Sequence, residues 1–452
     1  MNIPFLTLTI FFLFSSFAFG CTENWAIATC EVILFIGSGL TSLKNKDFLK
    51  LPQKLKVLAI FVSFLVVISL IQLIPIPVSV WRIFDQSRIE MYENTAKAEE
   101  LLQSEKYRLD PFEGTEIPYE SERYSPKLPN FLTITRTPIS TLRALIALLS
   151  FFCFLLLLEE IIRQGNDKLK NLALIVGLIG LAVGIIALVE KGIENKTHIL
   201  WFRESVRAQT AFGPFVNANH GAAFINLTFP ILYYLIWRKI RRENNFSEKL
   251  GLYFVALSLL LLQISLIISG FSYGNFLFLV ILPICFYFNL TFKKSNRFMF
   301  VIGVLILIFI FLLVIYFLFQ GAFEFETKRN MFQNGLKNCS FMGLGINSFR
   351  ETFSTLVERW PIIQPYKIEY LENEYLQIFY EGGIVAFIFA LLVAINIFTK
   401  AIKNIFSRTN LFWISVPLIG ETIRSGFDMT FHIFPLCGIF TLLYSLSLRE
   451  KN

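Results

Sequence analysis

Residues 171–189 read Asn171-Leu-Ala-Leu-Ile-Val-Gly-Leu-Ile-Gly-Leu-Ala-Val-Gly-Ile-Ile-Ala-Leu-Val189 and contain no charged side chain. A helix needs about 20 mostly apolar residues to cross the hydrocarbon core of a bilayer. This run therefore predicts a transmembrane helix, and eleven further apolar runs predict the same. The twelve predicted spans are 4–20, 25–43, 57–75, 143–161, 171–189, 219–237, 251–269, 274–291, 298–319, 376–398, 411–427 and 432–448.

The composition also favours a membrane protein. Of 452 residues, 55% are hydrophobic and only 16% are charged, whereas soluble domains carry about 25% charged residues. A disordered chain and a disulfide scaffold are excluded, because 51 Phe and 6 Cys fit neither class. The sequence predicts an all-α polytopic membrane protein with twelve transmembrane helices and long periplasmic loops.

The charges predict which segments face the cytoplasm. With both termini placed inside, the six inner segments hold 21 Lys and Arg against seven acids. The long outer loops, 76–142, 190–218 and 320–375, hold 18 Lys and Arg against 21 acids. Basic short loops face the cytoplasm in most membrane proteins. We therefore expect both termini in the cytoplasm, and the net charge of +8 requires no nucleic-acid partner.

Since membrane spans carry few charges, we expect catalytic or binding residues in the outer loops and at their borders. No P-loop, no GxGxxG after a strand and no GxSxG occurs in the chain, so nucleotide-driven and Ser-hydrolase chemistry lack their motifs. The Cys residues show no metal-ligand spacing, and we expect no metal or cofactor. The spans divide the chain into helices 1–3 (1–75), a first loop (76–142), helices 4–9 with the loop 190–218 (143–319), a large loop (320–375) and helices 10–12 (376–452).

The second outer loop ends in Asn217, Asn219 and His220, where the sixth span begins. Asn is a good helix cap and His a poorer one, so capping is one interpretation. Ligand binding is the other, because three such groups exceed what one cap needs. Two nearby residues, Arg203 and Arg207, add donors that suit phosphate.

The third outer loop contains Arg329, the Gly343-Leu-Gly345 turn and the Glu372-Asn-Glu374 sequence. The glycines allow a tight turn or a close approach of the backbone to a ligand. The two Glu precede the tenth span, where a helix N-terminus stabilises anions. The simpler interpretation is that the two carboxylates stabilise the helix N-terminus and that Asn373 caps it. A binding site is the alternative.

The last outer turn carries Arg424, Asp428 and His432. Ionisable groups at membrane depth are costly and are rarely accidental. They could pair with one another, and Asp428 and His432 have the i, i+4 spacing of a helical pair.

Taken together, these segments resemble those of the O-antigen ligase superfamily, a group of integral-membrane glycosyltransferases. The resemblance runs along most of the chain and rests on the order and spacing of short motifs rather than on one of them. The matching segments are Leu73-Ile-Pro-Ile-Pro77, Pro138-Ile-Ser-Thr-Leu-Arg143, Gly213-Pro-Phe-Val-Asn-Ala-Asn-His220, Ser269-Gly-Phe-Ser-Tyr-Gly274, Arg329, Gly343-Leu-Gly345, Phe349, Glu372-Asn-Glu-Tyr-Leu-Gln377, Glu381-Gly-Gly383, Phe427-Asp428 and Pro435.

The resemblance implies a GT-C-like fold in a bacterial inner membrane and transfer of a glycan at the periplasmic face. The donor would be a glycan on undecaprenyl diphosphate, and the acceptor lipid A-core or another glycan. In that family Arg grips the diphosphate, no metal is required, and a His acts as base on the acceptor. When the family's roles are transferred to the matching positions of this chain, the catalytic residues are Glu372 and Arg329. The substrate-binding residues are Arg207, Asn217, Asn219, His220, Tyr273, Asn373 and Asp428.

Two residues depart from the family pattern. Glu372 stands where the family has its His, and Tyr273 stands where it has an Arg. A carboxylate can still accept a hydroxyl proton, whereas a Tyr hydroxyl offers one hydrogen bond and no charge. Glu374 should matter less than Glu372, since on a helix it would point about 200° away.

We therefore expect an O-antigen ligase-like transferase of lipid-linked glycans. A polymerase of the same superfamily is the nearest alternative. An inactive relative that binds the carrier, and a transporter of lipid-linked sugars, are alternatives of another class. Transporters place ionisable groups near the middle of the bilayer, whereas the candidates here cluster at the outer border of the spans.

Overall fold

The chain is seen in a computed structural model that describes residues 2–86, 88–90, 93–94, 129–193, 198–200, 203–204, 211–269, 322–356, 370–406 and 411–448. The described chain is mostly helical and contains little sheet. Its α-helices are α1 (Ile3–Phe17), α2 (Asn24–Lys44), α3 (Lys56–Gln72), α4 (Val78–Phe84), α6 (Pro138–Gln164), α7 (Asn166–Gly192), α8 (Ala218–Arg242), α9 (Phe246–Ser269), α12 (Ala322–Lys337), α13 (Phe349–Leu356), α14 (Glu374–Phe406), α15 (Phe412–Arg424) and α16 (Phe434–Ser447).

Ten of the twelve predicted spans coincide with helices, and the other two, 274–291 and 298–319, lie outside the described residues. Within the described ranges, five helices are long and apolar enough to cross a membrane: α2, α6, α7, α9 and α14. Helices α1, α3 and α16 are apolar but shorter. A helical membrane protein is therefore supported, while the count of twelve spans stays a prediction.

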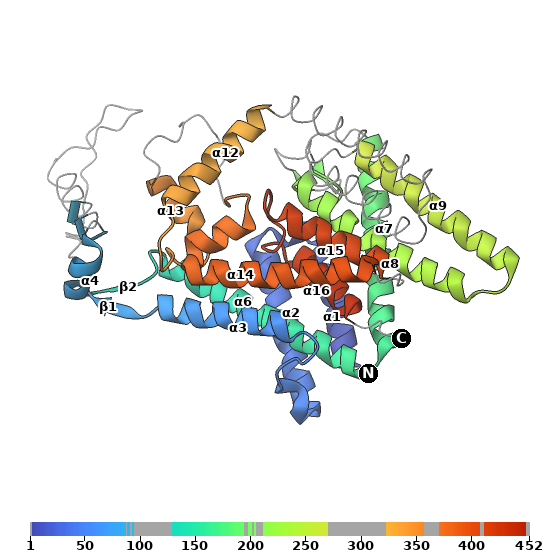
Figure 1. Cartoon of the computed structure of the whole chain (residues 1–452), viewed down its shortest axis with the longest axis horizontal. Coiled ribbons are helices and arrows are strands. Elements are labelled where there is room, and N and C mark those ends of the chain that lie inside the picture. The colour runs from blue at the N-terminus through green and yellow to red at the C-terminus, as the bar shows by residue number, and fades with distance from the viewer. Residues whose placement is uncertain are drawn as a thin grey trace.

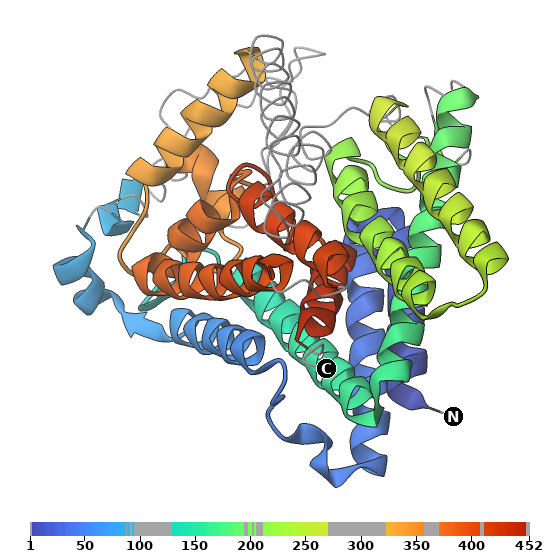
Figure 2. The same cartoon turned by 45° about the vertical axis from the view of Figure 1, so that its right-hand side comes forward.

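The helices form two groups that share a central core. Figure 1 places α3 and α14 alongside each other, and Figure 2 separates them from the green and yellow-green α7, α8 and α9. Between the groups lie α1, α6, α15 and α16, whose buried side chains make one continuous core. Its centre is aromatic, for the rings of Phe11 and Phe154 lie 5.3 Å apart between centroids.

Small residues let two of these helices approach closely. A Cβ on Gly180 of α7 would lie 2.1 Å from Thr228 Oγ1 of α8, and one on Gly177 would lie 2.5 Å from Leu232 Cδ2. Helix pairs in membranes commonly pack through small residues in this way, because no hydrophobic effect drives them together in lipid. Gly177 and Gly180 of the 171–189 run thus serve the contact between α7 and α8.

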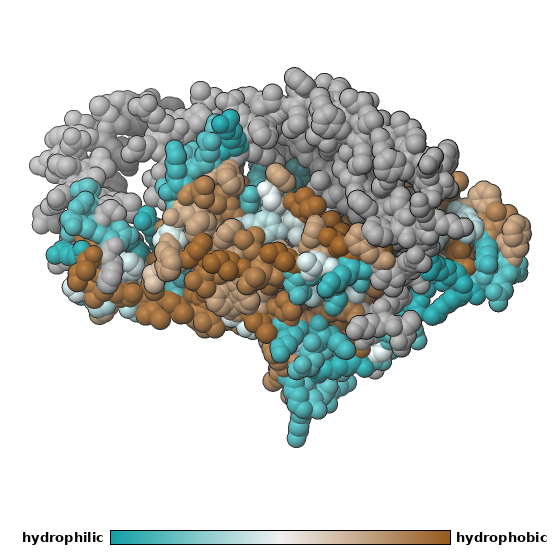
Figure 3. All heavy atoms as spheres, in the orientation of Figure 1, coloured by the Kyte–Doolittle hydropathy of each residue, from teal (hydrophilic) through white to brown (hydrophobic). Residues whose placement is uncertain are grey.

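One face of α14 carries apolar side chains that no other part of the described chain covers. Val385, Ile388, Leu392 and Ile395 recur at helical spacing and are each at least half exposed. Figure 3 shows an apolar surface over α3 and α14, with hydrophilic residues beyond it. Such a stripe is what a lipid-facing helix requires.

The two ends of the first outer loop are joined by a small sheet. Strand β1 (Pro75–Pro77) pairs antiparallel with β2 (Phe131–Thr133), with Ile76 opposite Leu132. A second pair, β3 (His198–Ile199) and β4 (Arg203–Glu204), lies in the second loop. Neither pair was predicted, because three-residue and two-residue strands leave no periodic signal.

Helix α14 is broken at Gly383, where φ is 79° and ψ is −177°. The span predicted over 376–398 lies within α14, and the break was not predicted. The helix begins at Glu374, and the break divides it into 374–382 and 384–406. A Cβ at Gly383 would lie 2.3 Å from the carbonyl oxygen of Phe341, so a segment distant in sequence causes the break.

Contacts between distant segments separate into two sets. Segments predicted to be cytoplasmic contact one another, through the pairs Asn2–Gln164, Asn45–Glu160, Lys54–Glu159 and Asn404–Ser447. Segments predicted to lie outside also contact one another, through Gln72–Ile346, Glu23–Arg203, Asn219–Arg424 and Asn373–Gly426. These contacts group the segments as the predicted topology does, and the sidedness itself stays a prediction.

Candidate functional site

Four segments that are far apart in sequence meet at one end of the helices. The Arg424 Nη2 donates to the carbonyl of Asn219, over 2.9 Å. The Asn373 side chain donates to the carbonyl of Gly426, and the N–H of Gly345 donates to the carbonyl of Glu381. The polar cluster formed here consists of Asn219, His220, Glu374, Gln377, Glu381, Glu421, Arg424, Asp428, Thr430 and His432.

Arg424 is the charged centre of one half of the polar cluster. Its side chain is 3% exposed, and its Nη2 lies 2.7 Å from Asp428 Oδ2. Its Nη1 lies 3.3 Å from Glu421 Oε2, which also accepts a hydrogen bond from the Thr430 hydroxyl. A buried guanidinium is tolerated only when it is paired and hydrogen-bonded in this way. Arg424 therefore holds the end of α15 to the turn that follows.

Glu374 is the centre of the other half. Its side chain is 2% exposed, and its Oε1 accepts the backbone N–H groups of Thr430 and Phe431, both over 2.7 Å. Its Oε2 lies 2.8 Å from His432 Nδ1. Both oxygens are thus occupied by the segment before α16, which they fix against the start of α14.

A row of polar side chains continues from His432 along α14. Gln377 Nε2 lies 3.4 Å from His432 Nε2 and donates to Glu381 Oε1 over 3.1 Å. Glu381 in turn accepts the N–H groups of Asn347 and Phe349. Phe349 begins α13, and a carboxylate at a helix N-terminus is stabilising. The row therefore connects the last turn of the chain to the Gly343-Leu-Gly345 segment.

The glycine turn packs against the break in α14. Gly343 and Gly345 have φ of 75° and 121°, and a Cβ on Gly343 would lie 2.2 Å from the carbonyl oxygen of Glu381. The N–H of Leu344 donates to Tyr380, and the N–H of Ile384 donates to Phe341. Of the two roles left open by the sequence, a tight turn in close contact with backbone is the one seen.

The first outer loop also reaches this region, through Gln72 at the end of α3. The Gln72 carbonyl oxygen Oε1 accepts the N–H of Ile346, and its Nε2 donates to the carbonyls of Glu381 and Met342. The side chain is 2% exposed. Because both the oxygen and the nitrogen of this buried amide are hydrogen-bonded, the side chain holds the end of α3 to residues 342–346 and to α14.

Two of the predicted site residues are helix caps. The Asn217 side chain accepts the N–H of Asn219 at the start of α8. The Asn373 side chain accepts the N–H of Leu376 at the start of α14. The capping interpretation is therefore confirmed for both. His220 has another setting, for it is 4% exposed and its Nδ1 has no hydrogen-bond partner within the described chain.

The pairing predicted for the last outer turn is wrong in part. Helix α15 ends at Arg424, and no helix is present between it and Phe434. Asp428 therefore pairs with Arg424, and His432 pairs with Glu374 instead of with Asp428. The i, i+4 argument fails because the turn is irregular.

The structure describes both predicted catalytic residues, and neither is a member of the polar cluster. Glu372 is half-buried, has φ of 54° and precedes α14. The 200° separation from Glu374 that a helix would impose therefore does not apply, and Glu374 is the more buried of the two. Arg329 is exposed on α12. Arg207 and Tyr273 lie outside the described residues.

Sequence reasoning gave no role to four members of the polar cluster, namely Gln377, Glu381, Glu421 and Thr430. Glu421 is an ionisable residue inside a predicted span, which is itself a signal. Glu374, Gln377 and Glu381 share the spacing of one helix face. Within the described ranges, no group of three or more His, Cys, Asp or Glu side chains is arranged to hold a metal ion.

Comparison with known proteins does not assign the chain. No family model and no curated protein sequence matches it. Its function must therefore be inferred from the geometry of the polar cluster and from the short motifs that the cluster brings together.

Proposed function

We propose that the protein is a membrane glycosyltransferase of the O-antigen ligase type. It would move a glycan from an undecaprenyl-diphosphate carrier to an acceptor hydroxyl or amine. The observation that carries this proposal is the convergence of the resembling motifs. Segments around Asn219, Gly345, Glu381 and Asp428 are far apart in sequence and yet contact one another at one end of the helices.

The proposed reaction needs a base for the acceptor and a cation for the leaving group. The acceptor proton passes to the Glu372 carboxylate as the acceptor oxygen or nitrogen bonds to the anomeric carbon. The bond from that carbon to the carrier phosphate breaks with inversion, and its electron pair leaves on the diphosphate. Arg329 stabilises this anion, because a guanidinium binds phosphate oxygens bidentately.

The placement of α12 supports a role for Arg329. A Cβ on Gly335 of α12 would lie 2.9 Å from Leu371 Cδ1, so α12 packs on the residue that precedes Glu372. Arg329 lies on the same helix and is exposed. Arg424, by contrast, is buried between two carboxylates. We therefore assign the diphosphate contact to Arg329 and a positioning role to Arg424.

The location of the buried charges favours transfer over transport. Glu374 is the first residue of α14, and Arg424 is the last residue of α15. Glu374 and Arg424 thus lie at helix ends, and Glu421 and Glu381 lie three and seven residues from those ends. Transporters instead place their ionisable groups near the middle of the bilayer. The proposal includes twelve spans, both termini in the cytoplasm of a bacterium and the polar cluster at the outer face of the inner membrane. A polymerase differs only in using another glycan as acceptor.

The proposal is tested in cells that lack the gene. Lipid-linked glycans should accumulate in those cells, and the wild-type gene should remove them. Arg329→Lys should fail to remove them although the protein remains in the membrane, because an ammonium acts only as a point charge. Arg163→Lys, at the opposite end of the helices, is the matched control and should behave as wild type. A deletion strain with unchanged lipid-linked glycans would contradict the proposal.

A further inference from the structure

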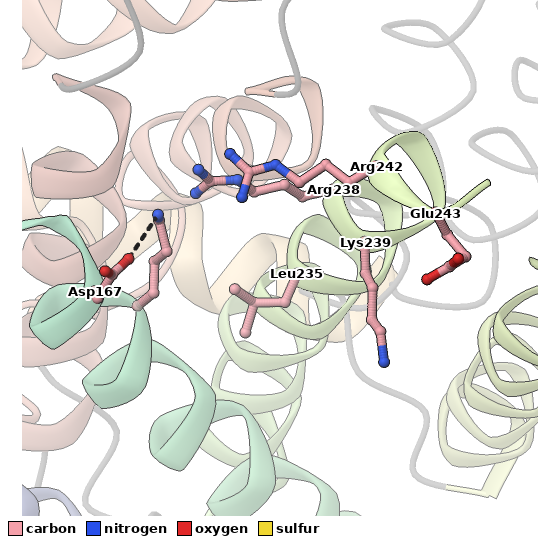
Figure 4. Close-up of a pocket in the computed structure, with 7 residues that line it drawn as sticks. Asp167, Leu235, Arg238, Lys239, Arg242 and Glu243 are labelled. Atoms are coloured by element: carbon pink, nitrogen blue, oxygen red, sulfur yellow. Dashed lines mark hydrogen bonds and ion pairs between the residues drawn. The ribbon is translucent and has the colours of Figure 1, made fainter. Parts of the chain in front are cut away.

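A cavity lies at the end of the helices opposite to the polar cluster. It has a volume of about 270 Å³ and is formed by the start of α7 and the end of α8. Figure 4 shows the residues that line it, which are Asp167, Lys170, Leu235, Arg238, Lys239, Arg242 and Glu243. Four of these residues are cationic and two are anionic, so the lining carries an excess of positive charge.

The two acids are already engaged. Lys170 Nζ lies 3.3 Å from Asp167 Oδ1. Glu243 accepts the backbone N–H groups of Asn244 and Asn245, over 3.0 and 3.1 Å. Within the described chain, Arg238 and Arg242 have no carboxylate partner. No ion pair among the described residues neutralises the two Arg or Lys239, and the two Arg are the cations that share one face of the cavity.

The two Arg are one turn apart on α8, and so they share a face. In Figure 4 their guanidinium groups extend toward Asp167, while Lys239 and Glu243 point away. Like charges held together repel unless an anion lies between them. Their neighbour Arg241 behaves differently, because its guanidinium lies over the Trp237 ring, 5.6 Å from the centroid, and does not line the cavity.

An apolar strip leads away from the cavity along α7. Leu174 and Leu178 follow Lys170 at successive turns of the helix, and they are 43% and 50% exposed. Leu235 adds an apolar wall within the cavity itself. A ligand with an anionic head and an apolar tail would contact the Arg pair and this strip at the same time.

We propose that this cavity binds the phosphate of an anionic phospholipid, with its acyl chains along Leu174 and Leu178. The Arg pair supplies bidentate donors for the phosphate oxygens. Basic pockets between helices at the cytoplasmic side of membrane proteins commonly bind anionic headgroups. The lipid would anchor the start of α7 to the end of α8, and this role does not depend on the glycosyltransferase proposal.

The test measures which lipid the purified full chain retains. Protein in detergent is incubated with equal amounts of phosphatidylglycerol and phosphatidylcholine, and bound lipids are counted by native mass spectrometry. Wild type should retain phosphatidylglycerol preferentially. The double variant Arg238→Gln/Arg242→Gln should reduce that preference roughly thirtyfold, as expected for the loss of two interfacial cations. Arg241→Gln, which removes the same charge outside the cavity, should leave it unchanged.

Two further arms keep the test decisive. The exposed Arg242→Gln variant alone should give an intermediate loss, which covers the case in which the double variant fails to fold. Millimolar inorganic phosphate should not displace the lipid, because it lacks the apolar part. An equal loss in Arg241→Gln, an unchanged preference in the Arg242→Gln variant, or full displacement by phosphate would overturn the proposal.

Discussion

The Oε2 of Glu374 lies 2.8 Å from Nδ1 of His432, and this pair joins the first residue of α14 to the segment that leads into α16. Both carboxylate oxygens of Glu374 are in use, because Oε1 accepts two backbone N–H groups. Such a carboxylate positions its surroundings and is poorly placed to meet a substrate. Glu372, two residues earlier, retains solvent-accessible surface, which a base for an incoming acceptor needs.

The buried carboxylates of Glu421 and Asp428 should depend on Arg424 for their stabilisation. Arg424→Ala leaves two buried carboxylates without their cation, and we expect a loss of about 3–5 kcal/mol in the free energy of unfolding. Arg163→Ala is the control, since Arg163 is one-third exposed at the other end of the helices and pairs with Glu159 and Glu160. Its loss should be about 0–1 kcal/mol. Thermal unfolding of both variants in detergent gives the comparison, and similar melting temperatures would contradict the pairing.

The break in α14 should tolerate no side chain at Gly383 or Gly343. A Cβ at either position would lie 2.3 or 2.2 Å from a carbonyl oxygen, on a backbone with positive φ. We expect Gly383→Ala and Gly343→Ala each to cost about 2–4 kcal/mol of stability. Gly251→Ala on α9 meets open space and should stabilise by up to about 1 kcal/mol. Melting temperatures in detergent test the three variants, and an unchanged value for Gly383→Ala would refute the close packing.

The predicted sidedness can be tested by labelling single cysteines with an impermeant maleimide. Asn130→Cys and Glu204→Cys should react in cells whose outer membrane alone is permeabilised, and Lys50→Cys and Asn245→Cys should react only after lysis of the inner membrane. All four positions are exposed. The native Cys339 should contribute little background, because burial raises the pKa of its thiol to about 11 and the thiolate is the reactive form. The reverse labelling pattern would exclude this topology.

Much of the fold could be predicted from the sequence, because long apolar runs have few alternatives to helices in a membrane. The start and the break of α14 could not, since the break depends on a backbone contact between Gly383 and Phe341. No local pattern reports such a contact. Only Pro75 and Pro77 marked the place where the small sheet of the first loop begins.

Some members of the polar cluster were singled out from the sequence, and the pairing suggested for them was partly wrong. Arg424, Asp428 and His432 were recognised from their cost at membrane depth, yet His432 pairs with Glu374 and not with Asp428. The spacing argument assumed a helix where the chain forms an irregular turn. Of the two roles left open for Asn217 and Asn373, capping is seen for both, and capping depends on neighbours within three residues.

The central claim is tested most directly by transfer of a glycan from a purified undecaprenyl-diphosphate-linked donor by wild type, Glu372→Gln and Glu372→His. Gln keeps the size of Glu but cannot accept a proton, so its rate should fall by about 10²–10⁴-fold, the usual contribution of a positioned base. His should retain part of the activity, because imidazole can accept the proton near neutral pH. Equal rates for wild type and Glu372→Gln would contradict the assignment of the base, and the absence of transfer by wild type would contradict the proposed function itself.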